Sequence, residues 1–217
     1  MESLDRRNFL KAGTLLTTGL TGLAVPTLEA HSTLPFDESS MYMVGPVKGY
    51  TPYIGILVSM LNYNRESIIK MVNGFTVEQL DHLNDKNSNS IGSLLLHLAA
   101  TDKFYQLNTF EGREFNEEEK KIWGAAMDLG DKGRAEIKGH DVKYYLDILA
   151  EVRNKTLEEL KKKDDEWMMA VDPKWSKPNQ SLNTFWKWFH VCEHESNHRG
   201  QIAYQRTRLP GGKWGKE

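Results

Sequence analysis

The sequence predicts an all-α protein, an antiparallel four-helix bundle. Apolar residues recur at helical spacing in four long segments, whereas no segment alternates apolar and polar residues with the period of a β-strand. No internal repeat or low-complexity tract interrupts this pattern. The 217 residues, of which 39% are hydrophobic and 27% charged, suit one globular domain with an appendage.

The first half of the domain contains two long helices with a short one between them. The first long helix is expected from Pro52 to Asn73, with apolar residues near helical spacing. Thr76 and Gln79 form a capping-box pattern that opens a short helix ending near Leu83. Ser90 caps the second long helix, which we expect to run from Ile91 to about Phe110.

The second half contains the other two long helices and an insertion. Residues 111–139 are charged and rich in glycine, so we expect a loop with one short helix near Glu117–Met127. The third long helix is expected from Asp141 to Lys163, followed by an irregular segment to about Gln180. The fourth is expected from Ser181 to Leu209 and ends at the Pro-Gly-Gly that follows.

The composition argues against several classes of protein. There are 28 Lys and Arg against 30 Asp and Glu, a net charge of −2, and no basic stripe, so no nucleic-acid partner is expected. The single cysteine, Cys192, excludes an intramolecular disulfide and a cysteine-rich zinc finger. No run reaches the roughly 20 apolar residues that a membrane-spanning helix needs, so no stable span is expected after processing.

Residues 1–30 are similar to an export signal. Residues 6–11 read RRNFLK, which resembles the twin-arginine pattern, and a short uncharged run from Ala12 to Pro26 follows. We therefore expect a protein exported to the periplasm or out of the cell. Removal of the signal near residue 30 would leave an extended tether over residues 31–49 and the helical domain over residues 50–217.

Histidines on the fourth helix suggest a metal site. His190, His194 and His198 are four residues apart, which places them on one helix face. The segment from His194 to His198 also fits the H-E-x-x-H zinc-binding pattern, with Glu195 in second position. Two imidazoles at this spacing can share one divalent ion at about 2.0–2.1 Å each.

The protease versions of this pattern are incomplete here, so a zincin protease is not expected. One version requires Gly and His at positions occupied by Gln201 and Tyr204, and the other finds only Glu217 as a downstream acid. A third ligand must therefore come from upstream, where His97 interrupts the apolar run from Leu94 to Ala100. The alternatives are a packing role for His97 and a solvent-exposed face for the other histidines.

Two segments resemble the metal-binding four-helix bundles of the DinB-like superfamily. Residues 89–99, NSIGSLLLHLA, resemble its second-helix motif, and residues 190–202, HVCEHESNHRGQI, resemble its C-terminal motif. The resemblance covers roughly residues 50–210 and implies one divalent ion bound through His97, His194 and His198. Some members are thiol-dependent transferases or isomerases. The long insertion and the export signal depart from the family pattern.

Three neutral histidines leave at least one coordination position open, as in catalytic zinc sites. We expect zinc, with nickel, iron or copper as alternatives, in a hydrolase or a thiol-type transferase acting on a small molecule. The catalytic residue is unknown. Glu195 is a weak candidate for a proton acceptor, because it points about 100° away from His194, and a surface ion pair is the alternative. The competing interpretation is a non-catalytic module that binds metal or forms a homodimer through the bundle.

Other residues of the fourth helix carry structural expectations. Leu182, Phe185, Phe189 and Ala203 are expected to form the apolar stripe that faces inward. Gly200 lies inside the helix, where glycine costs about 1 kcal/mol relative to alanine, so we expect another helix to approach it closely. Cys192 is expected to be a buried small hydrophobic residue and not a nucleophile.

Export is predicted to depend on the arginine pair. Replacing Arg6 and Arg7 by lysine should keep the precursor in the cytoplasm, because the expected signal is read through both arginines. Fractionation followed by immunoblotting measures this directly, with a Lys11→Arg variant as the control. Export of the double variant at the unaltered rate would refute the targeting hypothesis.

Overall fold

The computed structural model describes residues 40–210, and these are all-helical, as predicted. Eight α-helices and one π-helical turn account for the regular structure of these residues, and their β-type pairing consists of two isolated bridges. The expected export signal and residues 31–39 of the expected tether lie outside the described residues. Among residues 40–210, no helix combines the length and apolar character that crossing a membrane requires.

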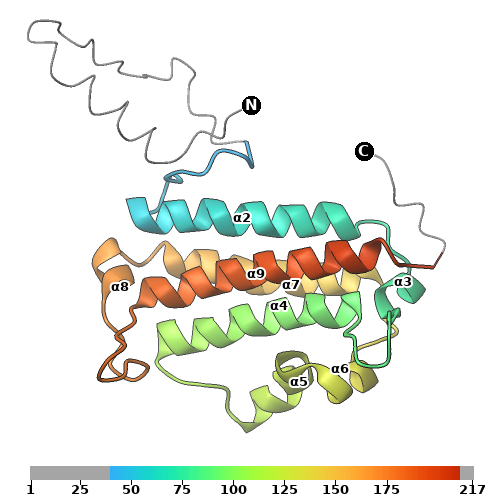
Figure 1. Ribbon diagram of the computed structural model, residues 1–217. Coiled ribbons are helices and arrows are strands. Elements are labelled where there is room, and N and C mark those ends of the chain that lie inside the picture. The colour runs from blue at the N-terminus through green and yellow to red at the C-terminus, as the bar shows by residue number, and fades with distance from the viewer. Residues whose placement is uncertain (1–39, 211–217) are drawn as a thin grey trace, which may run out of the picture. The chain divides into compact units, whose positions relative to one another are not determined.

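Four long helices form a bundle (Figure 1): α2 (Pro52–Val72), α4 (Ile91–Gln106), α7 (Val142–Leu160) and α9 (Thr184–Arg206). Helices α2 and α4 each pack against both α7 and α9. Helices α2 and α9 run in one direction, and α4 and α7 run in the other. Helices α4 and α9, which pack against each other, are therefore antiparallel. Helices α4 and α7, which also pack against each other, are parallel.

The caps confirm where the predicted helices begin. The Ser90 hydroxyl accepts a hydrogen bond from the amide of Ser93, and the Asp141 carboxylate caps α7 in the same way. Thr76 and Gln79 form the reciprocal capping box that opens the short helix α3 (Val77–Asp81). Helix α4 ends earlier than predicted and continues as a π-helical turn, Leu107–Glu111.

The segment between α4 and α7 is more ordered than the expected loop with one short helix. Helix α5 (Glu117–Asp128) is followed after one residue by α6 (Gly130–Glu136). Because α4 and α7 are parallel, the chain must return along the bundle before α7 can begin. Helices α5 and α6 make this crossover, and α5 packs against α4 on the way. The crossover is thus a requirement of the topology.

The connection from α7 to α9 contains another short helix, α8 (Asp165–Met169), which packs against α2 and α9. The Asp165 carboxylate accepts hydrogen bonds from the hydroxyl of Thr51 and from the amides of Tyr53 and Ile54. The first residue of α8 thereby caps the start of α2 from a distant part of the sequence.

The bundle interior consists of two apolar clusters separated by a layer of buried charge. One cluster gathers residues of the first half of α4 and the second half of α2, and the other gathers residues of the first halves of α2 and α9. Between them lies the charge quartet, defined as Arg65 of α2, Asp102 of α4, Arg153 of α7 and Glu195 of α9. Each of these residues is at most 6% exposed.

Every member of the charge quartet is paired. Arg65 Nε and Arg153 Nη2 each donate to a different oxygen of Glu195, both at 2.7 Å. Arg153 Nε donates to Asp102 Oδ2 at 2.8 Å. Nη1 of Arg65 donates to the carbonyl of Leu149, and Nη1 of Arg153 to the carbonyl of Leu61. Two positive and two negative groups, one from each helix, cancel within a layer from which water is largely excluded.

The inward face of α9 differs from the prediction. Phe189, which was assigned to the apolar stripe, is 47% exposed, whereas Trp188, Val191 and Ile202 are buried. The buried face also carries Glu195 and Gln205. An apolar stripe could not locate this face, because the polar residues on it are held by partners outside α9.

Breaking the charge quartet should destabilise the bundle strongly. Arg153→Met removes three donors and leaves Asp102 and Glu195 buried with an uncompensated charge. We expect the free energy of unfolding to fall by about 3–5 kcal/mol, measured by urea denaturation. Lys143→Met is the matched control, because it breaks an exposed ion pair with Asp147 and should leave the urea midpoint unchanged. Equal effects of the two substitutions would contradict the central role of the quartet.

Candidate metal centre

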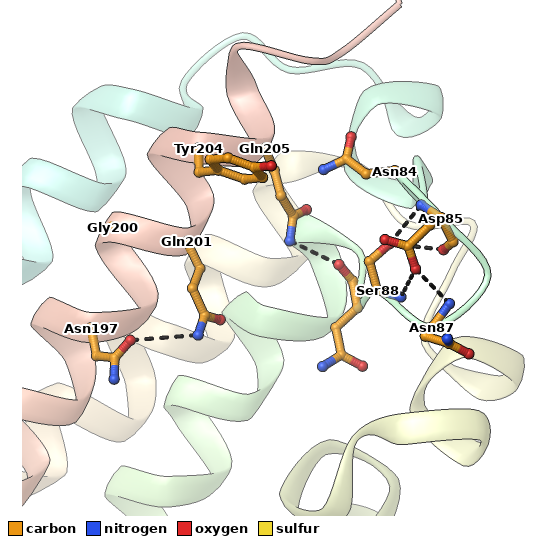
Figure 2. A pocket seen from close by; sticks show the side chains of 10 residues that line it. Asn84, Asp85, Asn87, Ser88, Asn197, Gly200, Gln201, Tyr204 and Gln205 are labelled. Carbon is orange, nitrogen blue, oxygen red and sulfur yellow. Dashed lines mark hydrogen bonds between the residues drawn. The ribbon is translucent and has the colours of Figure 1, made fainter.

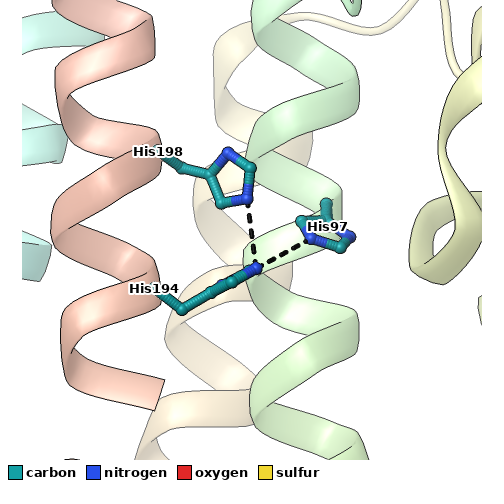
Figure 3. A group of neighbouring side chains, drawn as sticks. All are labelled: His97, His194 and His198. Atoms are coloured by element: carbon teal, nitrogen blue, oxygen red, sulfur yellow. Dashed lines mark hydrogen bonds between the residues drawn. The ribbon is translucent and has the colours of Figure 1, made fainter. Parts of the chain in front are cut away.

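Three histidines from two helices converge on one point. His97 lies on α4, and His194 and His198 lie one turn apart on the facing side of α9 (Figure 3). The Nε2 atom of His194 is 3.1 Å from the Nε2 atom of His97 and 3.1 Å from that of His198. Within the described residues, these three form the one group of His, Cys, Asp and Glu side chains that could hold a metal ion.

The outer ring nitrogens of two of these histidines are held by oxygen atoms. His97 Nδ1 lies 2.8 Å from the backbone oxygen of Ala126, and His198 Nδ1 lies 2.9 Å from Gln201 Oε1. Because Gln201 Nε2 donates to Asn197, its oxygen faces the imidazole. Both Nδ1 atoms therefore carry the proton, and in the neutral rings both Nε2 atoms present a lone pair.

This arrangement fits a shared cation. The Nε2 atom of His194 carries at most one proton and can direct it at only one of its two neighbours, so the other 3.1 Å contact joins two electron-rich nitrogen atoms with no hydrogen bond between them. A positive ion between the nitrogens removes this repulsion. Tetrahedral zinc with bonds of 2.0–2.1 Å separates its nitrogen ligands by about 3.3 Å, close to the separations found here. The donor set and its spacing are thus compatible with one divalent ion.

The surroundings keep all three rings neutral. Burial lowers the pKa of His194 to about 3, with repulsion from His198, His97 and His190 adding to the effect. Burial is also the main cause of the lowered pKa values of His97 and His198. Neutral imidazole is the form that binds a metal, so these rings are in the ligating state at pH 7.

Comparison with known families agrees with this geometry. A sequence model of one protein family, described as mycothiol-S-transferase, matches residues 56–211, which include both helices of the site. The chain belongs to the mycothiol-S-transferase family. This family is part of the DinB-like superfamily, so the predicted resemblance is confirmed at that level. No curated protein matches the chain.

His190 does not belong to the cluster of His97, His194 and His198. Its ring stacks on Trp186, with centroids 5.4 Å apart, and its Nδ1 atom contacts Glu193 at 2.8 Å. The His190 and His194 rings are neighbours, 5.6 Å apart, yet the nitrogen atoms of His190 do not join the convergent group. The structure therefore brings together the three histidines of the predicted site and leaves out His190, although it lies on the same face of α9 as His194 and His198.

Glu195 lies in a different environment from the one expected. The surface ion pair considered from the sequence is a buried one, since Glu195 is 1% exposed and both its oxygens bind arginines. Burial acts to raise the pKa of Glu195, but Arg153 and Arg65 outweigh it and keep the pKa below its usual range. The carboxylate is thus a fixed, charged member of the quartet that separates the apolar clusters.

A polar pocket adjoins the site (Figure 2). Its volume is about 570 Å³, and its walls are the loop of residues 84–89 and the last turns of α9. Gln201 links the two features, because it lines the pocket and also holds His198. Gly200 lies in the pocket wall, and a Cβ atom there would meet nothing within 4 Å. The predicted close approach of another helix to Gly200 is therefore wrong.

Sequence reasoning missed the outer contacts of the histidines. The Ala126 carbonyl belongs to the short helix that was expected near Glu117–Met127, but a backbone group leaves no signal in a residue pattern. Gln201 was detectable, since it follows the histidine pair in the motif at residues 190–202. The amides of the pocket loop were also visible as the polar run of residues 84–89, but nothing in that run shows that it faces α9.

Metal binding should resist mild acid. Because burial lowers the pKa values of the three histidines, protons compete with the ion only below the ordinary imidazole value of about 6.5. We expect the affinity for zinc to stay within about twofold from pH 8 to 6.5 and to fall at lower pH, measured by competition with a chromophoric chelator. A peptide of residues 190–202 is the control, and its affinity should already fall through pH 6.5. The same midpoint for protein and peptide would contradict this prediction.

Proposed function

We propose that this protein is a metal-dependent thiol transferase that holds one divalent ion, zinc in the first instance, through His97, His194 and His198. The convergence of three Nε2 atoms, two of them with fixed tautomers, is the observation that carries the proposal. Family membership favours thiol transfer over hydrolysis. We further propose that the protein acts after export, on the basis of the sequence of residues 1–30 alone.

The thiol has to come from a substrate. Cys192 is the single cysteine of the chain, and it is buried. Burial and the nearby charge of Glu195 raise the pKa of its thiol, and the amide of Asn64 lies against the sulfur. A buried, protonated thiol is a poor nucleophile. These properties support a small-molecule thiol as cosubstrate, and the family description makes mycothiol the first to test.

The residues of the site have separate roles in this proposal. A bound divalent ion would supply a Lewis acid that favours the thiolate form of a thiol placed beside it. His97 and His198 keep their Nε2 lone pairs directed at the common point through Ala126 and Gln201. The amide groups of Asn197 and Gln201 line the adjoining pocket and can hold a polar substrate next to the histidines. Glu195 fixes α9 through the charge quartet.

Removal of His97 should separate a shared site from a chance cluster. His97→Ala is expected to lower zinc affinity at least tenfold, or more than about 1.4 kcal/mol, because one of three ligands is lost. His190→Ala is the matched control on the same face of α9 and should remain within about threefold. A chelator competition titration measures both, with circular dichroism to show that each variant is folded. Equal affinities of the two variants would contradict the proposed ligand set.

Turnover tests the transferase part of the proposal. Mycothiol and other small thiols are offered with 1-chloro-2,4-dinitrobenzene, on which the thiolate sulfur replaces chloride. We expect thiol-dependent product formation that EDTA abolishes, that zinc restores, and that His97→Ala reduces at least tenfold while His190→Ala does not. Folded, zinc-loaded protein that gives no thiol transfer with any thiol would favour the non-catalytic metal-binding module instead.

A further inference from the structure

The crossover between α4 and α7 contacts His97 through the backbone at the end of α5. The carbonyl of Ala126, in the last turn of α5, accepts the Nδ1 proton of His97 at 2.8 Å. Carbonyl groups at a helix C-terminus lack partners within the helix and carry partial negative charge. Such an acceptor fixes the orientation of a histidine ring and makes its other nitrogen a stronger ligand.

The Ala126 carbonyl is available to His97 because α5 ends at Asp128, two residues further along the chain. In a continuous α-helix the amide of residue 130 would bond to the carbonyl of residue 126. Here Leu129 adopts φ 57° and ψ −137°, and Gly130 adopts φ 61°, so the chain turns and α6 begins in a new direction. The Gly130 amide lies 3.3 Å from Asn89 Oδ1 and donates to it instead.

The turn is unfavourable for the residue that makes it. Leu129 is the one non-glycine residue with positive φ among residues 40–210. Bulky residues rarely adopt such angles, and strained residues of this kind persist where the surrounding structure holds them. Gly130 tolerates its positive φ, and Asn89 supplies the acceptor that replaces the carbonyl of Ala126. Asn89 also lies next to Ser90, the cap of the helix that carries His97.

We infer that the α5–α6 turn is a positioning device for His97, in which Gly130 and Asn89 keep the Ala126 carbonyl directed at its Nδ1 atom. The inference deepens the proposed function, since its role is to present Nε2 of His97 to a shared ion. The device also reaches the polar pocket, because Asn89 lines that pocket and its backbone oxygen accepts from Gln205 at 2.9 Å. The crossover that the topology requires thus completes the metal centre.

Two glycines of the crossover provide a matched test. Gly130 and Gly139 both have positive φ, and a Cβ atom at either position would meet nothing within 4 Å. Alanine at either position therefore strains the backbone without a steric clash. Relief of that strain at residue 130 continues α5 into α6 and turns the Ala126 carbonyl toward the amide of residue 130. Relief at residue 139 leaves the Ala126 carbonyl in place.

Two measurements on each variant separate this inference from the proposed function. The ¹⁵N NMR spectrum of the His97 ring in the metal-free protein reports whether Nδ1 carries the proton. A chelator competition titration reports zinc affinity. We expect Gly130→Ala to lose the pure Nδ1–H form of His97 and at least fivefold in affinity, whereas Gly139→Ala keeps that form and stays within twofold. Asn89→Ala, which removes the alternative acceptor, should follow Gly130→Ala.

The outcomes are distinct. Unchanged His97 spectra in both Gly130→Ala and Asn89→Ala would overturn the inference, whatever the metal affinity. Equal losses of affinity in Gly130→Ala and Gly139→Ala would also overturn it, since a general loss of stability would then explain both. If unaltered protein shows the Nδ1–H form and Gly130→Ala loses it while neither binds zinc, the positioning device stands and the proposed function fails.

Discussion

Four charges buried at one level of the bundle must pair with one another, because an isolated charge in this interior would cost several kcal/mol. Each long helix supplies one member, so the pairing fixes how far every helix is shifted along its neighbours and how it is rotated. His194 directly precedes Glu195 on α9, and His97 lies just over one turn before Asp102 on α4. Once Arg153 has bound both carboxylates, the two helices that carry the histidines are in register.

Topology determines what else reaches the site. Parallel packing of α4 and α7 requires a return segment, and the chain uses that segment to bring the end of α5 against His97. Helices α7 and α9 run in opposite directions, so the short helix α8 and the loop after it join them at one end of the bundle, where Lys187 near the start of α9 pairs with Asp172 and Asn108. Connections that look like insertions in the sequence therefore hold the ends of the helices and one histidine of the cluster.

Local signals account for what could be predicted from the sequence. Strong caps such as Ser90 and Asp141 marked helix starts within a residue, and the family motifs led to the three histidines that the structure brings together. Helix α6 escaped prediction because it begins at Gly130 and contains Gly133, both weak helix formers. The charge quartet escaped prediction because a buried, paired charge has the same sequence pattern as an exposed one. Only the partners on other helices distinguish Glu195 from a surface residue.

X-ray absorption at the metal edge, recorded on protein purified from cells, tests most directly whether the helix bundle holds three imidazoles around one ion. We expect close to one divalent ion per chain, with three imidazole nitrogens at about 2.0–2.1 Å if the ion is zinc, and an exchangeable light-atom ligand. In His97→Ala, loaded at a high zinc concentration, the ion should have two imidazole ligands in place of three. A sulfur neighbour from the chain, fewer than three imidazoles in the unaltered protein, or protein that binds no ion when zinc is supplied would contradict it.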